Sequence, residues 1–133
     1  MGASAVAAPG DAAAAAAAAA VAAFVGDGTA QPGMIAIDLA AEVEDGNSVP
    51  LSVMVDSPMT PDNYVSDVLV VADANPWPRV ATLHFSPLSG RAEFSTRIRL
   101  VDSQTVIVVA KTSDGRLFTA RQRVDVIVGA CKS

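Results

Sequence analysis

Apolar and polar side chains alternate through residues 93–100, which read EFSTRIRL. Phe94, Ile98 and Leu100 fall on one side of such a segment, and the charged residues fall on the other. Alternation with a period of two is typical of a β-strand that has one face in the core and one in water. Residues 51–56, LSVMVD, repeat the pattern. Both stretches therefore predict half-buried strands.

Short β-branched runs of this kind recur from residue 34 onward, and turns rich in Pro, Gly, Asn and Asp separate them at intervals of about ten residues. The clearest hairpin turn is Ser113-Asp114-Gly115. We therefore predict an all-β fold, an immunoglobulin-like antiparallel β-sandwich over residues 34–128. Its expected strands are 34–39, 49–55, 64–72, 79–86, 92–100, 104–111 and 117–128.

An alanine-rich segment precedes the predicted sandwich, with unbroken alanine over residues 12–20. Alanine has the highest intrinsic helix propensity, Asp11 is a suitable N-cap, and Gly26 is a suitable stop. We predict a disordered N-terminus over residues 1–10 and an N-terminal helix over residues 11–26. A low-complexity linker with transient helicity is the alternative, because alanine buries little apolar surface.

The composition excludes several classes of protein. The chain has 133 residues, a net charge of −5 and a pI near 4.6, which argues against a nucleic-acid partner. The alanine run is too weakly apolar for a membrane span. The first basic residue is Arg79, so an intact secretory signal is not expected. The single cysteine excludes an internal disulfide and a cysteine-based zinc site.

Charge is distributed unevenly along the chain. Residues 1–78 carry ten acids and no Lys or Arg, whereas residues 79–133 carry four acids and nine bases. Attraction between the halves of one domain and a charged surface for a partner both explain this asymmetry, and we favour the first. Two short basic ladders, Arg97 with Arg99 and Arg121 with Arg123, are expected to pair across strands with acids such as Glu93 or Asp125, with anion binding as the alternative.

The common catalytic constellations lack parts in this chain. It has no Gly-rich phosphate loop and no Ser-centred nucleophile elbow, and its one histidine is His84. We expect His84 to be structural or to face a partner. Glu42, Glu44 and Asp45 fit a solvated turn better than a calcium loop. Trp77, between two prolines, is expected in the core or at an interface.

Cys131 is the residue that points to covalent chemistry. It lies three residues beyond the last predicted strand, in a tail without apolar periodicity that reads Gly129-Ala130-Cys131-Lys132-Ser133. Free cysteines are usually buried, so a cysteine on a terminal segment is poorly placed for packing and well placed for reaction. Lys132 beside it favours the thiolate and attracts anions. An incidental terminal cysteine is the alternative.

Motifs between residues 49 and 131 occur in the order of a known family. They are Ser57-Pro58-Met59-Thr60, Asn75-Pro76, Pro78-Arg79-Val80-Ala81-Thr82, Phe85, Ser95-Thr96-Arg97-Ile98-Arg99-Leu100, Gln104-Thr105-Val106-Ile107, Ser113-Asp114-Gly115 and Val126-Ile127-Val128-Gly129 before Cys131. Together they resemble SoxY, the sulfur-carrier subunit family of the bacterial Sox thiosulfate-oxidation system. The helical segment near the N-terminus is similar in placement to that family's helix.

The resemblance implies a non-enzymatic sulfur carrier in the periplasm, with no metal, cofactor or catalytic residue of its own. By position, Cys131 is the covalent attachment point for thiosulfate and sulfane sulfur, on a flexible carrier arm over residues 129–133. The implied partners are a SoxZ-like β subunit, which forms a heterodimer and covers apolar strand edges, a SoxXA-like haem enzyme that loads thiosulfate, and a SoxB-like hydrolase that releases sulfate.

The arm departs from the family pattern, which is Gly-Gly-Cys-Gly-Gly. Gly129 and Cys131 match, whereas Ala130, Lys132 and Ser133 do not. An Ala in place of Gly narrows the freedom of the backbone, and Lys and Ser add bulk. The family is exported by a twin-arginine signal that this chain lacks, which fits a processed form.

Two other classes remain open. The first is a non-catalytic β-sandwich interaction module whose Cys131 forms an intermolecular disulfide, such as a Cys131-linked homodimer. The second is a thiol enzyme that uses Cys131 with His84, which requires the tail to fold back onto the strand predicted at 79–86.

Overall fold

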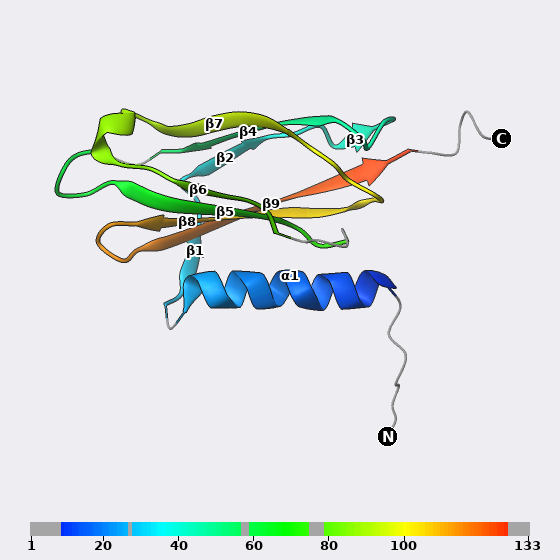
Figure 1. Cartoon of the computed structure of the whole chain (residues 1–133), viewed down its shortest axis with the longest axis horizontal. Coiled ribbons are helices and arrows are strands. Elements are labelled where there is room, and N and C mark those ends of the chain that lie inside the picture. The colour runs from blue at the N-terminus through cyan, green and yellow to red at the C-terminus, as the bar shows by residue number, and fades with distance from the viewer. Residues whose placement is uncertain (1–8, 27, 57–58, 75–78, 128–133) are drawn as a thin grey trace, which may run out of the picture.

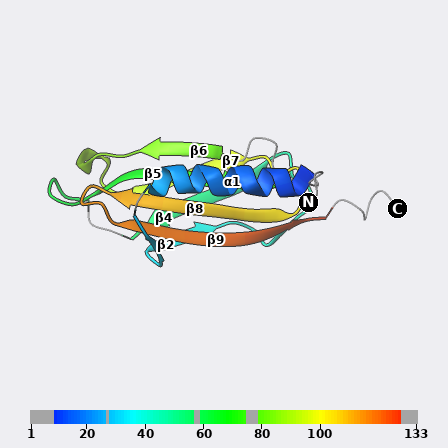
Figure 2. The same ribbon diagram turned by 90° about the horizontal axis from the view of Figure 1, so that it is seen from below.

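The computed structural model describes residues 9–26, 28–56, 59–74 and 79–127. In this part of the chain a helix and two β-sheets form three layers, with the helix on the outer face of the larger sheet (Figures 1 and 2). The predicted all-β fold, an immunoglobulin-like sandwich preceded by an alanine-rich helix, is confirmed.

The larger sheet has the order β1-β9-β8-β5-β6, and a further short strand, β3, also pairs with β9. Its strands are β1 (Ala30–Pro32), β3 (Glu42–Val43), β5 (Val65–Ala72), β6 (Arg79–His84), β8 (Gln104–Thr112) and β9 (Leu117–Val126). The smaller sheet has the order β2-β4-β7 and consists of β2 (Ile35–Asp38), β4 (Val49–Val55) and β7 (Ala92–Ile98). A 3-10 turn, η1 (Pro87–Ser89), connects β6 to β7.

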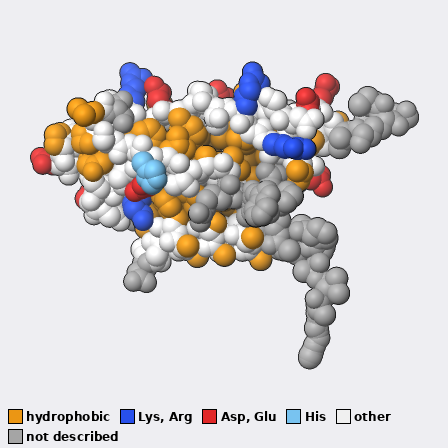
Figure 3. Space-filling model, in the orientation of Figure 1, with side chains coloured by type: hydrophobic (Ala, Val, Ile, Leu, Met, Phe, Trp, Pro, Cys, Tyr) orange, Lys and Arg blue, Asp and Glu red, His pale blue; other side chains and the backbone are white. Residues whose placement is uncertain are grey.

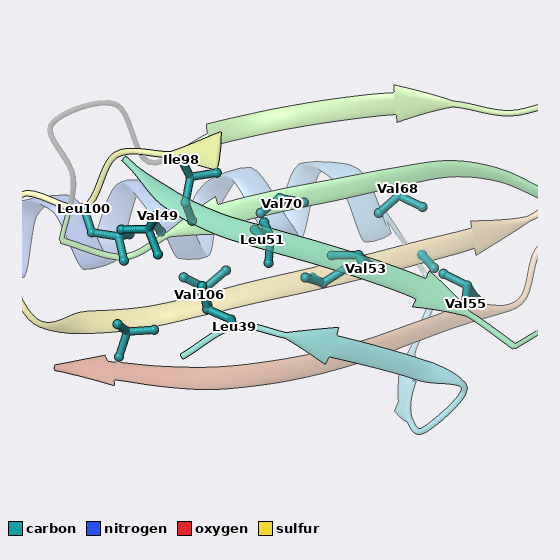
Figure 4. Packing of buried hydrophobic residues seen from close by; sticks show 14 of the residues in the cluster. Leu39, Val49, Leu51, Val53, Val55, Val68, Val70, Ile98, Leu100 and Val106 are labelled. Carbon is teal, nitrogen blue, oxygen red and sulfur yellow. The ribbon is translucent and has the colours of Figure 1, made fainter. Parts of the chain in front are cut away.

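The main core lies between the two sheets. In β4, Leu51, Val53 and Val55 are buried, and the residues between them are at least partly exposed, as the alternation predicts. They pack against inward-facing valines of the larger sheet, such as Val68 and Val106 (Figure 4). Burial of these aliphatic side chains is the main source of stability for the sandwich.

A second core joins the helix α1 (Pro9–Val25) to the other face of the larger sheet. Ala17 is 1% exposed in this layer and packs with larger side chains of β5 and β8. The helix begins at Pro9, two residues before the predicted cap at Asp11, so the predicted disordered N-terminus is wrong for Pro9 and Gly10. Proline is well tolerated in the first turn of a helix because the backbone N–H groups there have no helical partner.

The structure adds two short strands to those expected from the sequence. β1 and β3 both pair in parallel with β9, a contact between segments distant in the chain that local patterns do not reveal. The last strand ends at Val126 rather than at residue 128. The remaining strands agree with the prediction to within two residues at each end.

The two long sides of the sandwich differ. On one side β1 and β3 cover parts of β9, and β2 lies close to β9. On the other side, β6 and β7 are the outer strands of their sheets. Several apolar side chains that pack on the core there are only partly buried, and Figure 3 shows hydrophobic side chains gathered along this side; they are Val80, Ala81, Leu83, Phe85 and Phe94.

Candidate functional site

The predicted attachment point and the arm around it lie outside the described residues. This applies to Cys131 and to Gly129, Ala130, Lys132 and Ser133, and also to Trp77. The structure does describe the place from which the arm departs, because the chain can be followed to Ile127. The described part of the candidate site is therefore the end of β9, from which the arm starts.

The end of β9 is held by three backbone N–H groups that donate in succession. Asp125 N donates to the carbonyl oxygen of Ala41 at 2.8 Å, and Ile127 N donates to the carbonyl oxygen of Val43 at 2.8 Å. Between them, Val126 N donates to Ser103 Oγ, also at 2.8 Å. We call residues 41–43, Ser103 and residues 125–127 the arm-root clamp. Because of this clamp, the chain is anchored through the end of β9 and as far as Ile127.

The clamp rests on a turn without room for a side chain. A Cβ atom at Gly46 would lie 2.1 Å from the carbonyl oxygen of Leu100, so only glycine fits there. The Leu100 N–H donates to the carbonyl oxygen of Gly46 at 2.7 Å. This turn therefore fixes the segment that contains β3 against the loop that contains Ser103.

Gln104 braces the same loop from inside the protein. Gln104 is only 1% exposed. Its Nε2 donates to the carbonyl oxygen of Asp102 at 2.9 Å, and its Oε1 accepts from Ala74 N at 2.8 Å. A buried amide with satisfied hydrogen bonds holds a unique geometry, because losing one partner leaves an unpaired polar group. Ser103, next in sequence to both braced residues, is thereby held in place.

Carboxylates surround the arm root. Glu42 and Asp125 are register partners in the parallel pair of β3 with β9, and Glu44 and Asp45 follow in the exposed turn. Arg123 Nε contacts Asp125 Oδ1 at 3.2 Å and offsets part of this charge. The predicted solvated turn is wrong for Glu42, which lies in β3, but Glu44 and Asp45 do lie in an exposed turn, and all three acids adjoin the segment that leads to Cys131.

The expected cross-strand pairing with an acid is wrong for Arg123. Arg123 pairs with Asp125 two residues along the same strand. Glu93 is approached by Arg91 at 3.9 Å, again within one strand segment. Arg97 Nη1 instead donates to Ser48 Oγ at 3.3 Å. Arg91 and Arg123 are paired locally, because a long side chain reaches i±2 on the same face of a strand as easily as a neighbouring strand, whereas Arg97 reaches across to the segment that leads into β4.

His84 lies far from the arm root. Its Nδ1 is 2.5 Å from Asp67 Oδ1, and its side chain is 76% exposed. Register partners run straight across the larger sheet from His84 through Asp67 and Lys111 to Leu117. Ile127 is ten residues further along, roughly 30 Å in a strand. Four more residues lead to Cys131 and span at most about 14 Å. Cys131 therefore does not reach His84 within one chain.

Sequence reasoning missed Ala41, Val43 and Ser103 as the partners that hold the end of β9. Val43 lies between two glutamates and reads as part of a loop, and a serine in a turn such as Ser103 is too common to single out. Gln104 stood in one of the quoted family motifs, but its buried position is a tertiary feature.

Among the described residues, no group of three or more His, Cys, Asp or Glu side chains is arranged to hold a metal ion. The described helix is not long and apolar enough to cross a membrane.

A family model described as sulfur oxidation protein SoxY matches residues 21–131. The solved structure of the sulfur carrier protein SoxY from Chlorobium limicola f thiosulfatophilum is similar, with a TM-score of 0.71 and 27% identity, over 84% of this chain and 96% of that chain. No curated protein matches the chain.

Superoxide reductases resemble the chain in fold alone. The neelaredoxin from Ignicoccus hospitalis has a TM-score of 0.63 and 14% identity, over 71% of this chain and 81% of that chain. The superoxide reductase from Nanoarchaeum equitans has a TM-score of 0.58 and 10% identity, over 72% of this chain and 100% of that chain.

Proposed function

The chain belongs to the SoxY family, with a sulfur-carrier role in sulfur oxidation, and from this premise we propose that it holds sulfur intermediates covalently on Cys131 and presents them to partner enzymes. One observation carries the proposal. The family match runs to residue 131, which is the only cysteine of the chain and lies four residues beyond the last residue of the arm-root clamp. A thiol there is tethered to a rigid domain by a short segment, as a carrier requires.

The proposed chemistry needs two partner reactions. In loading, the Cys131 thiolate and thiosulfate lose two electrons to a SoxXA-like haem enzyme, and an S–S bond forms between the cysteine sulfur and the outer sulfur of thiosulfate. In release, water cleaves the bond between sulfane sulfur and sulfonate in a SoxB-like hydrolase. Sulfate and two protons leave, and a persulfide stays on Cys131. The chain supplies the thiol and no catalytic group, cofactor or metal of its own.

The altered arm retains the atoms that this chemistry uses. Only the sulfur of Cys131 forms or loses a bond, so Ala130, Lys132 and Ser133 affect the fit of the arm into a partner rather than the reaction itself. Lys132 follows Cys131 in the sequence and brings a positive charge that attracts the thiosulfate anion.

The proposed obligate partner is a SoxZ-like β subunit, and the side formed by β6 and β7 supports this. Leu83, Phe85 and Phe94 belong to the core yet remain partly exposed there, and Leu88 in η1 is 96% exposed. Outer strands with apolar side chains are prone to association unless a partner covers them. The periplasm is the proposed location, because the Sox system to which the family belongs works there.

The test is intact-protein mass spectrometry under non-reducing conditions after incubation with thiosulfate and a SoxXA-type enzyme. A reducible thiosulfate- or sulfur-sized adduct is expected on the wild type and not on Cys131→Ser. The double variant Ala130→Gly, Lys132→Gly brings the arm closer to the family pattern and is expected to load at least as completely.

An unmodified thiol, or only a disulfide-linked dimer, would contradict the proposal. In that case the interaction module with an intermolecular Cys131 disulfide would account for the data, and the dimer would disappear on reduction.

A further inference from the structure

A terminal segment is ordered only as far as its backbone is hydrogen-bonded. Among the described residues, the end of β9 is held by tertiary contacts, because β9 leaves its partner β8 after the register pair of Val124 with Gln104. Beyond that pair, residues 125–127 are held by β3 on one side and by Ser103 Oγ on the other.

We propose that Ser103 and β3 are positioning elements that set the reach of the carrier arm. The proposal rests on the proposed function, because it concerns the reach of the Cys131 sulfur. With the clamp closed, Cys131 is four residues beyond Ile127, a distance of at most about 14 Å along the chain. With the clamp open, β9 is still held at Val124, which is fully buried, and Cys131 is seven residues beyond that anchor, a distance of at most about 24 Å along the chain.

Ser103 is suited to this role because it is itself fixed. Its backbone N–H donates to Asp102 Oδ1 at 2.7 Å, and the carbonyl of Asp102 accepts from buried Gln104. The hydroxyl therefore presents an acceptor to Val126 N at a constant position. Val126 also packs against the core through its side chain, so the clamp joins one side-chain contact to three hydrogen bonds.

A short tether has a mechanistic consequence. An arm about 14 Å long enters a partner only when the carboxylate-rich surface around its root, which includes Glu42 and Glu44, lies close to the partner's entrance. The clamp thus couples delivery of sulfur to docking of the domain. A longer arm would deliver sulfur with looser docking, at the lower effective concentration of a longer linker.

The matched variants are Ser103→Ala and Ser113→Ala. Both serines accept a backbone N–H on Oγ, but Ser113 accepts from Tyr64 N, at 3.1 Å, at the opposite end of the sandwich. Hydrogen exchange of the Val126 and Ile127 amides is expected to become roughly five-fold faster in Ser103→Ala and to stay unchanged in Ser113→Ala. Ser103→Thr keeps the hydroxyl and is expected to restore slow exchange.

Reach is measured with a nitroxide on Cys131, the only cysteine of the chain. Paramagnetic broadening of amide signals in β8 and β9 behind the arm root is expected to be stronger in Ser103→Ala than in the wild type or in Ser113→Ala, because opening of the clamp moves the root of the tether back to Val124. Equal exchange and equal broadening in the two alanine variants would overturn the proposal, even if both variants are fully folded.

The two proposals fail in different experiments. Exchange and broadening need no sulfur, so a clamp that behaves as expected on a chain that never loads thiosulfate would overturn only the carrier function. Conversely, a wild type that loads normally while Ser103→Ala shows no change in exchange or reach would overturn only the clamp.

Discussion

At the residue scale, short-range polar contacts determine the ends of the sandwich. Ser103 and Gln104 act at the arm root, and Asp114 acts in the β8–β9 hairpin at the opposite end. There the hydroxyl of Thr112 donates to Asp114 Oδ1, and Arg116 Nε lies 3.0 Å from Asp114 Oδ2. The hydrogen bond from Thr112 is the largest cause and holds the pKa of Asp114 below its ordinary value; desolvation opposes it, and the contacts with Arg116 lower the pKa further.

The lowered pKa of Asp114 predicts a pH dependence. Folding favours the carboxylate, so the contribution of Asp114 to stability is present above its unfolded pKa and is lost as the pH falls through its folded pKa. We expect Asp114→Asn to lower the melting temperature at neutral pH. As the pH falls below about 4, the melting temperature of the variant should then fall less than that of the wild type, because the variant has no carboxylate to protonate at this position. Thermal melts across this range test the expectation, with exposed Asp62→Asn as the control. The same dependence of melting temperature on pH in Asp114→Asn and in the wild type would contradict it.

At the element scale, the number of covered faces determines which residues a strand can carry. β5 and β8 are buried almost throughout, because the smaller sheet covers one face and α1 covers the other. In β4, by contrast, only the face toward the larger sheet is buried. An alanine helix suits this arrangement, because its small side chains allow a close approach to the bulky aliphatic side chains of the sheet.

The packing of α1 predicts a contrast between two alanines. Ala17→Leu places a larger side chain where the helix meets the sheet, and we expect a loss of about 1–3 kcal/mol in the free energy of unfolding. Ala18→Leu is the matched control, because residue 18 is exposed and leucine has nearly the same helix propensity as alanine. Urea denaturation measures both. Equal stability of the two variants would mean that α1 does not pack as described.

At the scale of the whole molecule, the length of β9 separates two regions. The arm root lies at the end of β9, whereas His84 is level with its first residue, Leu117. The contact of His84 with Asp67 joins the acidic and the basic halves of the sequence, but Arg91, Arg116 and Arg123 contact acids only two residues away. The favoured interpretation, attraction between the halves, is therefore not supported by these three arginines.

This separation predicts that His84 does not act on Cys131. We expect His84→Ala to leave the rate of alkylation of Cys131 by iodoacetamide, and its dependence on pH, unchanged. Loading of thiosulfate onto His84→Ala by the SoxXA-type enzyme is measured as well. Slower loading than in the wild type would mean that His84 faces that partner. A shifted pH profile of alkylation would revive the thiol enzyme, with His84 supplied by a second copy of the chain.

Local chemistry in the sequence was sufficient for the sandwich and for the helix. Alternation over residues 51–56 and 93–100, turn residues such as Gly115, and alanine propensity all act between near neighbours in the chain, so they can be read without a structure. The single cysteine in the tail, together with the family motifs, was also sufficient for the candidate attachment point.

Only the tertiary structure showed where that tail begins. The pairing of Glu42 with Asp125 joins residues more than eighty positions apart, and the hydrogen bond to Ser103 depends on a loop braced by buried Gln104. Such contacts form because the two sheets and their connecting loops pack together, and no local pattern encodes the resulting distance. For the same reason, the side of the sandwich left open between β6 and β7 became visible only in the folded chain.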